Sequence, residues 1–131
     1  MDAPGNVVGL GADLCAVPRI AAARARHGQA FLDKVFTAAE QAECLGRGDP
    51  DASLAARWAA KEAVSKALGT GIGPELGLTS VEVTCDAATG APSVRLDALG
   101  ERTLRARGGR RILVTLSHDD GRALAVALVL A

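Results

Sequence analysis

The sequence predicts an α+β fold in which a mostly antiparallel sheet packs against one long helix, with smaller helices at one side. Three observations support this class. An alanine-rich helical pattern, SLAARWAAKEAVSKAL, covers residues 53–68. Short β-compatible runs fill most of the chain beyond Leu78, and an apolar run stands near the N-terminus. The length of 131 residues fits a single domain over residues 1–131, and no repeat or long linker divides it.

The first half of the chain predicts one strand and two helices ahead of the long helix. VVGLGADL, residues 7–14, is short, apolar and punctuated by glycine, which favours a buried strand. Pro18 suits the first turn of a helix that continues through RIAAARAR. Thr37, followed three residues later by Glu40, is a capping box, so a second helix starts there and ends at Gly46.

The second half of the chain predicts strands in pairs. SVEVTCD and PSVRLD flank the turn AATGA, and RILVTLS and RALAVALVL flank the turn HDDG. A short helix at roughly residues 98–107 is expected between the two pairs. The apolar tail ALAVALVLA is shorter than the about 20 residues that a bilayer span requires, so we expect a buried strand there.

Charge and composition exclude several classes of function. Fifteen Lys and Arg residues balance fifteen Asp and Glu residues, so the net charge gives no support to binding of nucleic acid or of a membrane surface. Aromatic residues make up 2 % of the chain, too few for stacking on single strands. The three cysteines lack zinc-ligand spacing and fit reduced thiols in a cytoplasmic protein. The start MDAPGN predicts no secretory signal.

Two acidic residues in apolar surroundings indicate a cation site. Glu62 and Lys66 are four residues apart and share one helix face, where alone they would form a surface ion pair worth about 0.3–0.5 kcal/mol. Alanines surround them, however, and a buried carboxylate needs an ionic partner or a metal. Asp13 follows an apolar strand and raises the same question. Two such carboxylates can share Mg²⁺, whose other ligands are waters and substrate phosphates, so the pattern predicts phosphate chemistry.

A glycine-rich run, GTGIG, follows the long helix and begins with Gly69, Thr70 and Gly71. A helix C-terminus is the negative end of the helix dipole, so the run cannot bind phosphate as a helix N-terminus does. Contact with an anion would come from turned backbone amides, or from Lys66 and Arg57 nearby. The simpler alternative is a helix stop.

Ser117, His118 and Asp119 stand where a strand ends and a turn begins. Neighbouring Ser and His residues do not form a hydrolase dyad, and the GxSxG elbow is absent from the sequence. His118 fits a donor to a ligand, or a structural histidine, better than a base for Ser117. Asp119 has three candidate roles, which are to orient His118, to approach a metal or to shape the turn.

Three segments, in order, resemble the holo-[acyl-carrier-protein] synthases, the short, homotrimeric type of 4′-phosphopantetheinyl transferase. They are GLGADLCAVPRI at 9–20, FTAAEQAEC through RWAAKEAVSKALGTGIG at 36–73, and VTLSH at 114–118. Together they span nearly the whole length, and the middle segment is the most specific. The resemblance implies the 4′-phosphopantetheinyl transferase fold, a cytoplasmic location, and sites built at the interfaces between the subunits of a homotrimer.

The resemblance also implies an activity, in which the phosphopantetheine arm of coenzyme A is transferred to a serine of an apo acyl carrier protein and adenosine 3′,5′-bisphosphate is released. By the matching positions, Asp13 and Glu62 would hold Mg²⁺, with Mn²⁺ as the alternative ion. Lys66 would neutralise pyrophosphate charge, and Arg19 would contact the acidic recognition helix of the carrier protein. The residues implied to contact coenzyme A are Arg57, Glu62, Lys66, Gly69, Thr70, Gly71 and His118, and the implied catalytic set is Asp13, Glu62, Lys66 and His118.

Alternatives remain open at this point. One is a non-catalytic coenzyme A or carrier-protein binding module of the same fold. Another is a structural oligomer without a ligand, in which the acidic pair would be exposed and far apart. The proton acceptor is open among Asp13, Glu62, Asp119 and a metal-bound water. The sequence departs from the family pattern at Trp58, where Phe is common, and at Arg122, where Tyr is frequent.

Overall fold

The computed structural model describes residues 6–131, so the prediction about a secretory signal falls in part on residues 1–5, outside the described range. The chain combines segregated helices with antiparallel strands, which confirms the α+β class. The elements are β1 (Val7–Ala16), α1 (Val17–His27), α2 (Gln29–Val35), α3 (Ala38–Leu45), α4 (Pro50–Leu68), the 3-10 turn η1 (Leu78–Ser80), β2 (Val81–Cys85), β3 (Pro92–Leu96), α5 (Ala98–Ala106), β4 (Arg111–Asp119) and β5 (Arg122–Leu130).

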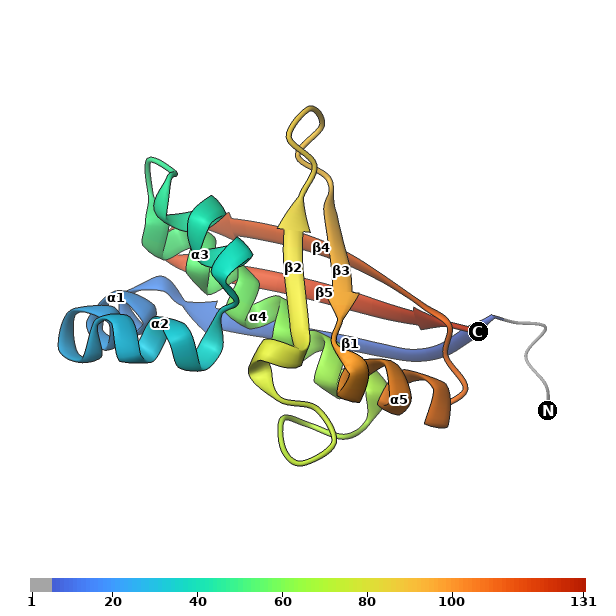
Figure 1. Cartoon of the computed structure of the whole chain (residues 1–131). Coiled ribbons are helices and arrows are strands. Elements are labelled where there is room, and N and C mark those ends of the chain that lie inside the picture. The colour runs from blue at the N-terminus through green and yellow to red at the C-terminus, as the bar shows by residue number, and fades with distance from the viewer. Residues whose placement is uncertain (1–5) are drawn as a thin grey trace.

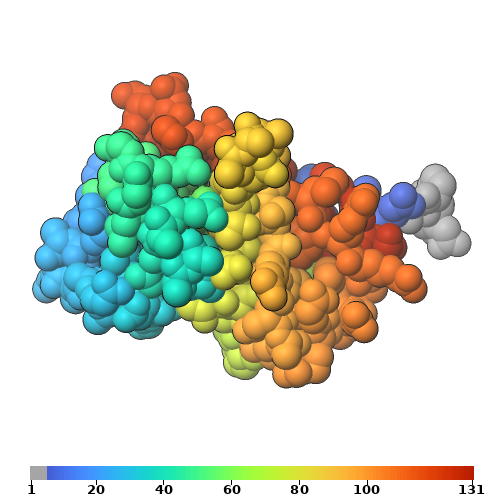
Figure 2. Space-filling model, turned by 45° about the horizontal axis from the view of Figure 1, so that its top comes forward, coloured from blue at the N-terminus to red at the C-terminus, as the bar shows by residue number. Residues whose placement is uncertain are grey.

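Helix α4 lies at the centre, between two antiparallel sheets (Figure 1). A three-stranded sheet has the order β1-β5-β4, and the hairpin β2–β3 forms a second sheet. Helices α1, α2 and α3 gather at one end of the molecule, and α5 lies toward the other end beside the hairpin (Figures 1 and 2). The sequence predicted antiparallel strands in one sheet, but the strands form two because the long helix separates the hairpin from β1 and β5.

Helix α4 begins earlier than the predicted range of 53–68 because two local signals start it. The side chain of Asp49 accepts a hydrogen bond from the backbone N–H of Ala52, and Pro50 occupies the first turn. The helix ends at Gly69, whose φ of 78° is the left-handed conformation that glycine adopts without strain. The predicted helix stop in the glycine-rich run is confirmed.

The three-stranded sheet is built around β5, which pairs antiparallel with both β1 and β4. Asp119 pairs with Arg122, so only Asp120 and Gly121 form the turn between β4 and β5. Both turn residues have positive φ, 51° and 75°, as the hairpin turns that match strand twist require. The apolar tail is therefore a strand, as predicted. Within residues 6–131, no helix has both the length and the apolar character needed to cross a membrane.

The smaller helices agree with the sequence signals except for α2, which was not predicted. The capping box at Thr37 is confirmed, since the Thr37 side chain accepts from the N–H of Glu40 and the Glu40 side chain accepts from the N–H of Thr37. Helix α5 matches the helix expected at 98–107. Helix α2 has only seven residues, too few to produce a clear helical period, and buried Leu32 and Val35 anchor it.

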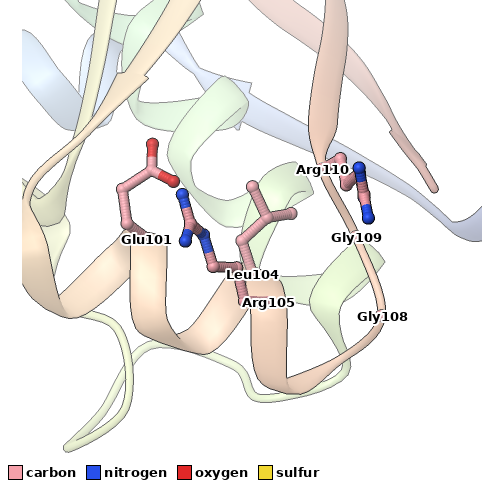
Figure 3. A pocket seen from close by; sticks show the side chains of 6 residues that line it. All are labelled: Glu101, Leu104, Arg105, Gly108, Gly109 and Arg110. Carbon is pink, nitrogen blue, oxygen red and sulfur yellow. The ribbon is translucent and has the colours of Figure 1, made fainter.

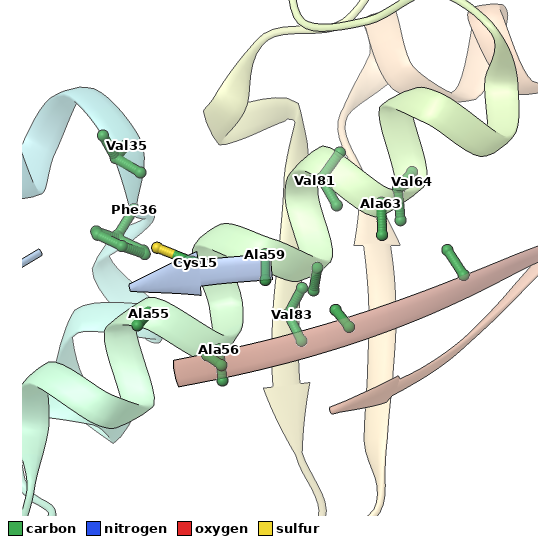
Figure 4. Packing of buried hydrophobic residues seen from close by; sticks show 14 of the residues in the cluster. Cys15, Val35, Phe36, Ala55, Ala56, Ala59, Ala63, Val64, Val81 and Val83 are labelled. Atoms are coloured by element: carbon green, nitrogen blue, oxygen red, sulfur yellow. The ribbon is translucent and has the colours of Figure 1, made fainter. Parts of the chain in front are cut away.

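The core is made from small side chains, and two glycines allow its closest contact. Buried alanines of α4 face β1 and β5, and side chains from α2 and the β2–β3 hairpin complete the cluster (Figure 4). A Cβ atom built on Gly9 would lie 1.9 Å from the carbonyl oxygen of Ala67, and one on Gly11 would lie 2.1 Å from that of Ala63. Strand β1 and helix α4 therefore touch backbone to backbone, which only glycine permits at these two positions.

A fully buried ion pair joins α3 to α4. The ammonium of Lys61 lies 2.7 Å from Oε1 of Glu40, and both side chains are 0 % exposed. Lys61 also donates to the carbonyl oxygens of Leu78 and Val81, while Glu40 accepts from the backbone N–H of Val83. Burial lowers the pKa of Lys61, and the charge of Glu40 opposes that effect. The pair ties α3, α4 and the start of β2 together.

Candidate active site

Strand alternation places Asp13 beside α4. Gly9 and Gly11 contact the backbone of α4, and side chains two residues apart on a strand point to the same face. Asp13 continues that row, and Cys15, which is 2 % exposed, follows it into the core. Strand β1 and helix α4 run in opposite directions here, because Gly9 meets Ala67 and Gly11 meets Ala63. The carboxylate of Asp13 therefore lies against α4, where it meets Lys66 in the last turn.

Lys66 is the first partner of Asp13. Its ammonium lies 2.9 Å from Oδ1 of Asp13 and also donates to the carbonyl oxygen of Ala12, at 3.2 Å. The hydrogen bond to Asp13 is the main reason that the pKa of Lys66 is raised. The Asp13 side chain is 17 % exposed and that of Lys66 is 53 % exposed. Lys66 therefore stays charged and lies where a ligand from solvent could meet it.

Glu62 lies within reach of the charge on Asp13. Burial raises the pKa of the Glu62 carboxyl, and the negative charge of Asp13 raises it further. The positive charges of Lys66 and Arg19 act in the opposite direction but do not cancel the rise. Asp13 and Glu62 therefore lie close enough for their negative charges to repel each other. The alternative of two exposed and distant carboxylates does not fit this coupling.

These two carboxylates suit a hard divalent cation. Carboxylate oxygens are the ligands that Mg²⁺ prefers, and an added positive charge would relieve the repulsion between Asp13 and Glu62. Over residues 6–131, no group of three or more His, Cys, Asp and Glu side chains is placed to hold a metal. A cation here would therefore need further oxygens from water or from a bound phosphate, as Mg²⁺ sites usually do.

Arg19, on α1, approaches the same cluster. Its guanidinium carbon lies 5.9 Å from the ring centroid of Trp58, and the Trp58 ring stacks on Phe31 at 6.4 Å. The charge of Arg19 lowers the pKa of Glu62. Trp58, which stands where the family commonly has Phe, thus supports an arginine at the edge of the acidic pair.

The glycine-rich turn has no spare amides at its start. The backbone N–H groups of Thr70 and Gly71 both donate to the carbonyl oxygen of Ser65, at 3.1 and 3.2 Å, and the N–H of Gly69 donates to that of Lys66. These amides close the C-terminus of α4 and are not free to form an anion nest. Of the two sources of anion contact considered for this turn, the side chains of Lys66 and Arg57 remain, and the turned amides do not.

Arg57 is buried, which the sequence did not indicate. Its side chain is 2 % exposed, and its Nη2 lies 2.9 Å from Oε1 of Glu43. The guanidinium also donates to Cys44 Sγ and Cys85 Sγ. Its Nε is buried and has no hydrogen-bond partner among the described residues. Because buried N–H groups are nearly always paired, this atom marks a position where a ligand could complete the bonding.

A cavity of about 180 Å³ joins Arg57 to His118. It lies between α4, the β2–β3 hairpin and the end of β4, and its polar lining is Arg47, Ser53, Arg57, Cys85, Thr115, Ser117 and His118. His118 is in register with Ala123 on β5, so the sheet fixes its position. Asp119 closes the same strand opposite Arg122, and of its three candidate roles the structure directly supports shaping the turn.

A larger cavity of about 610 Å³ lies elsewhere, between α5 and the segment that leads to β4 (Figure 3). Its lining residues are Glu101, Leu104, Arg105, Gly108, Gly109 and Arg110. None of the predicted site residues lines it. Choosing the candidate site by cavity volume would therefore miss Asp13 and Glu62.

No role was predicted for Lys61 from the sequence. Lys61 faces the core and Glu62 faces the cluster with Asp13, although they are adjacent in sequence. Glu40 is the residue that could have indicated the different role of Lys61. A buried lysine on one helix needs a carboxylate partner, and Glu40 on the preceding helix supplies it. Cys85, which lines the cavity with Arg57, was also not singled out.

The fold and the site together define a small α+β protein in which one strand and one long helix carry a carboxylate pair with a lysine. Comparison with known proteins gives the family. A family model described as the 4′-phosphopantetheinyl transferase superfamily matches residues 9–127. Holo-[acyl-carrier-protein] synthase from Chlorobaculum parvum is 47 % identical over 120 residues, covering 92 % of this chain and 96 % of the relative. The synthase from Chlamydia muridarum is 45 % identical over 120 residues, covering 92 % of each.

Solved structures of similar fold belong to the same type of enzyme. The crystal structure of holo-[acyl-carrier-protein] synthase from Neisseria meningitidis has a TM-score of 0.86 and 31 % identity, covering 94 % of this chain and 98 % of that one. The Helicobacter pylori synthase in complex with coenzyme A has a TM-score of 0.81 and 29 % identity, covering 92 % and 98 %. This chain therefore belongs to the 4′-phosphopantetheinyl transferase superfamily and is an enzyme of the holo-[acyl-carrier-protein] synthase type.

Proposed function

We propose that the protein transfers the 4′-phosphopantetheine group of coenzyme A to a serine hydroxyl of an apo acyl carrier protein, in a Mg²⁺-dependent reaction. The serine oxygen forms a bond to the phosphorus that carries the pantetheine arm, and the pyrophosphate P–O bond breaks. Adenosine 3′,5′-bisphosphate leaves, and the serine proton passes to a base or water. The observation that carries the proposal is the cluster of Asp13, Glu62 and Lys66, whose contact and charge coupling join β1 to α4.

The cluster fits phosphoryl-type transfer because that chemistry depends on positioning and on stabilising charge. Asp13 and Glu62 would hold the Mg²⁺, and Mn²⁺ is the alternative ion. The ion, when bound, supplies positive charge to the phosphate oxygens. Lys66, with its ammonium anchored on Asp13 and half exposed, would neutralise charge on the pyrophosphate. Its hydrogen bonds to Asp13 and Ala12 hold it in place before the substrate arrives.

The cavity between Arg57 and His118 is the proposed place for the nucleotide end of coenzyme A. Arg47, Arg57 and His118 line it, and cationic and N–H donors suit phosphate groups. The unpartnered Nε of Arg57 supports a ligand there. Gly69, Thr70 and Gly71 would add close contact with the coenzyme through a turn of little steric bulk. Because their backbone amides are already hydrogen-bonded within the helix end, Lys66 would neutralise the phosphate charge.

Arg19 is the proposed contact for the carrier protein. It projects from α1 over Trp58 and acts electrostatically on Glu62, so a carrier that pairs with Arg19 would bring its serine near the acidic cluster. An acidic carrier surface would complement this arginine.

We also propose that the active unit is a homotrimer whose subunits share the site. The three-stranded sheet carries α4 on one face and leaves large apolar side chains on the other. These are Val8, Leu10 and Leu14 on β1, Leu113 on β4 and Leu124 on β5, with exposed fractions between 40 % and 65 %. A continuous apolar face of this kind favours burial against another subunit.

The proposed trimer can be tested by introducing a charged side chain on the apolar face of the three-stranded sheet. Leu10→Glu should shift the mass measured by light scattering toward that of a monomer, because burying an unpaired carboxylate is costly. Leu45→Glu is the matched control, since Leu45 is 40 % exposed but lies on α3, away from the sheet. A trimer mass for both variants would remove this face from the interface, and a monomer mass for the unaltered protein would remove the trimer.

The activity can be tested by mass spectrometry. The protein, coenzyme A, Mg²⁺ and an apo carrier protein should give a carrier heavier by one phosphopantetheine, and a carrier with its serine replaced by alanine should remain unchanged. A non-catalytic binding module is the competing function. It would bind coenzyme A in calorimetry but leave every apo carrier at its original mass, whichever divalent ion is added.

A further inference from the structure

Cys85 stands apart from the other two cysteines. Cys15 and Cys44 are 2 % and 0 % exposed, whereas Cys85 is partly exposed at the end of β2 and lines the cavity that contains Arg57 and His118. All three thiols are free in this structure. A small reagent in solution can therefore reach Cys85 through the cavity, while the other two sulfurs require the protein to open first.

The surroundings of Cys85 suit a reacting sulfur. Arg57 Nη2 donates to Cys85 Sγ at 3.3 Å, and a guanidinium donates more strongly to a negatively charged acceptor. Arg57 is 2 % exposed and fixed by Glu43, so this donor does not move away. Its buried Nε has no hydrogen-bond partner among residues 6–131, and Arg57 lines the same cavity as Cys85. A partly exposed thiol and a buried arginine with one unpaired N–H thus line the same cavity.

We infer that Cys85 is a site of thiol–disulfide exchange with low-molecular-weight disulfides, and that the resulting adduct blocks this cavity. The Cys85 thiolate attacks one sulfur of the disulfide, a new S–S bond forms to Cys85, and the other half leaves as a thiolate. The reaction needs no further oxidant, since one disulfide replaces another, and added thiol reverses it.

The adduct and the nucleotide would occupy the same small cavity. The cavity has a volume of about 180 Å³, so a group attached to Cys85 fills much of what Arg57 and His118 offer. The part of the inference that concerns coenzyme A rests on the proposed function. The fraction of protein molecules whose cavity can bind the nucleotide would then depend on the ratio of small thiols to small disulfides in solution, because that ratio sets how much Cys85 carries an adduct.

The experiment uses the intact protein and hydroxyethyl disulfide, a small neutral probe. We expect one adduct in the intact mass, which peptide mapping places on Cys85. Because Cys15 and Cys44 react only after local opening, their reaction should be at least about 100-fold slower. The adduct should weaken binding of adenosine 3′,5′-bisphosphate, measured by calorimetry, by at least about tenfold, and dithiothreitol should restore it. This nucleotide has no thiol and therefore does not itself reduce the adduct.

Cys85→Ser is the matched variant, since it keeps the size of the side chain and removes the thiol. It should acquire no adduct on this time scale, and the disulfide should leave its nucleotide affinity unchanged from its own untreated value. An equally fast adduct in Cys85→Ser, no adduct on the unaltered protein, or an adduct on Cys85 that leaves nucleotide binding intact would each overturn the inference. If untreated protein fails to bind the nucleotide while Cys85 reacts as expected, the coenzyme A assignment fails but the thiol site stands.

Discussion

The ammonium of Lys66 lies 2.9 Å from Oδ1 of Asp13, although the two residues are 53 positions apart. This contact joins the end of β1 to the last turns of α4. Glu62 lies one helical turn before Lys66, and burial, together with the charge of Asp13, raises the pKa of its carboxyl. The fold thus brings together two carboxylates and one ammonium that face solvent.

Replacing either carboxylate by its amide should remove the activity. Asp13→Asn and Glu62→Gln keep side-chain size but lose the negative charge that holds a divalent ion. We expect each to lower the rate of carrier modification by at least about 100-fold, which corresponds to about 2.7 kcal/mol of transition-state stabilisation. Intact-mass assays at saturating Mg²⁺ measure the rate. Glu101→Gln, in the separate cavity beside α5, is the control and should retain activity. Activity within a fewfold of normal in either amide variant would exclude that residue from the metal site.

Glu62 should make the ligand-free protein sensitive to pH. Its folded-state pKa is raised, so the folded protein holds this proton more tightly than the unfolded chain. The stability that Glu62 contributes is complete below its unfolded pKa of about 4.3 and is lost as the pH rises through the folded value. Glu62→Gln should therefore be as stable as the unaltered protein at acid pH and more stable at neutral pH.

Urea unfolding at several pH values, at one protein concentration and without divalent ions, measures this difference. Added Mg²⁺ should stabilise the unaltered protein at neutral pH and leave Glu62→Gln unchanged, because only the carboxylate pair gains from the cation. A stability difference between the two proteins that stays constant with pH would contradict the role given to repulsion and burial at Glu62.

Gly11→Ala should damage the contact between β1 and α4. The new Cβ would lie 2.1 Å from the carbonyl oxygen of Ala63 and 2.7 Å from the amide nitrogen of Ala67, so the strand must move away. We expect a loss of about 1–3 kcal/mol in the free energy of unfolding. Activity should fall with it, since Asp13 is two residues further along the strand. Gly48→Ala is the control, because its new Cβ would meet nothing in the described chain within 4 Å and its φ is not positive.

Lys61→Met should destabilise the protein without changing the chemistry directly. It leaves the Glu40 carboxylate buried without its cation, and breaking a buried ion pair in this way costs about 3–5 kcal/mol. Urea unfolding should detect the loss, while Lys34→Met, at an exposed position on α2, should have little effect. Equal stability of the two variants would mean that the buried pair contributes little to the fold.

Most of the fold could be predicted from local signals. Thr37 and Glu40 form the capping box that the sequence indicates, and the Asp120–Gly121 turn fixes the hairpin of β4 and β5. Helix α2 was missed because seven residues hold too little periodic information. The division into two sheets was missed because it depends on how α4 packs between the hairpin and the three-stranded sheet. The sequence of any one strand does not contain that information.

The candidate site was proposed from the pattern of residues and from family resemblance, whereas the surroundings of each side chain could not be inferred from the sequence. Asp13 and Glu62 could be proposed as a pair from their apolar surroundings, and the family resemblance gave Lys66 its role beside them. The burial of Arg57 against Glu43 and two cysteines could not, since its partners come from α3 and β2. The bonded amides of Thr70 and Gly71 likewise depend on how α4 ends.

Anomalous scattering from Mn²⁺ bound in crystals of the protein tests the central claim most directly. A single strong peak should lie within about 2.2 Å of carboxylate oxygens from both Asp13 and Glu62, and it should be absent from Asp13→Asn crystals grown in the same way. A peak bound to other residues, or one that persists unchanged in Asp13→Asn, would contradict the claim that strand β1 and helix α4 meet to hold the metal.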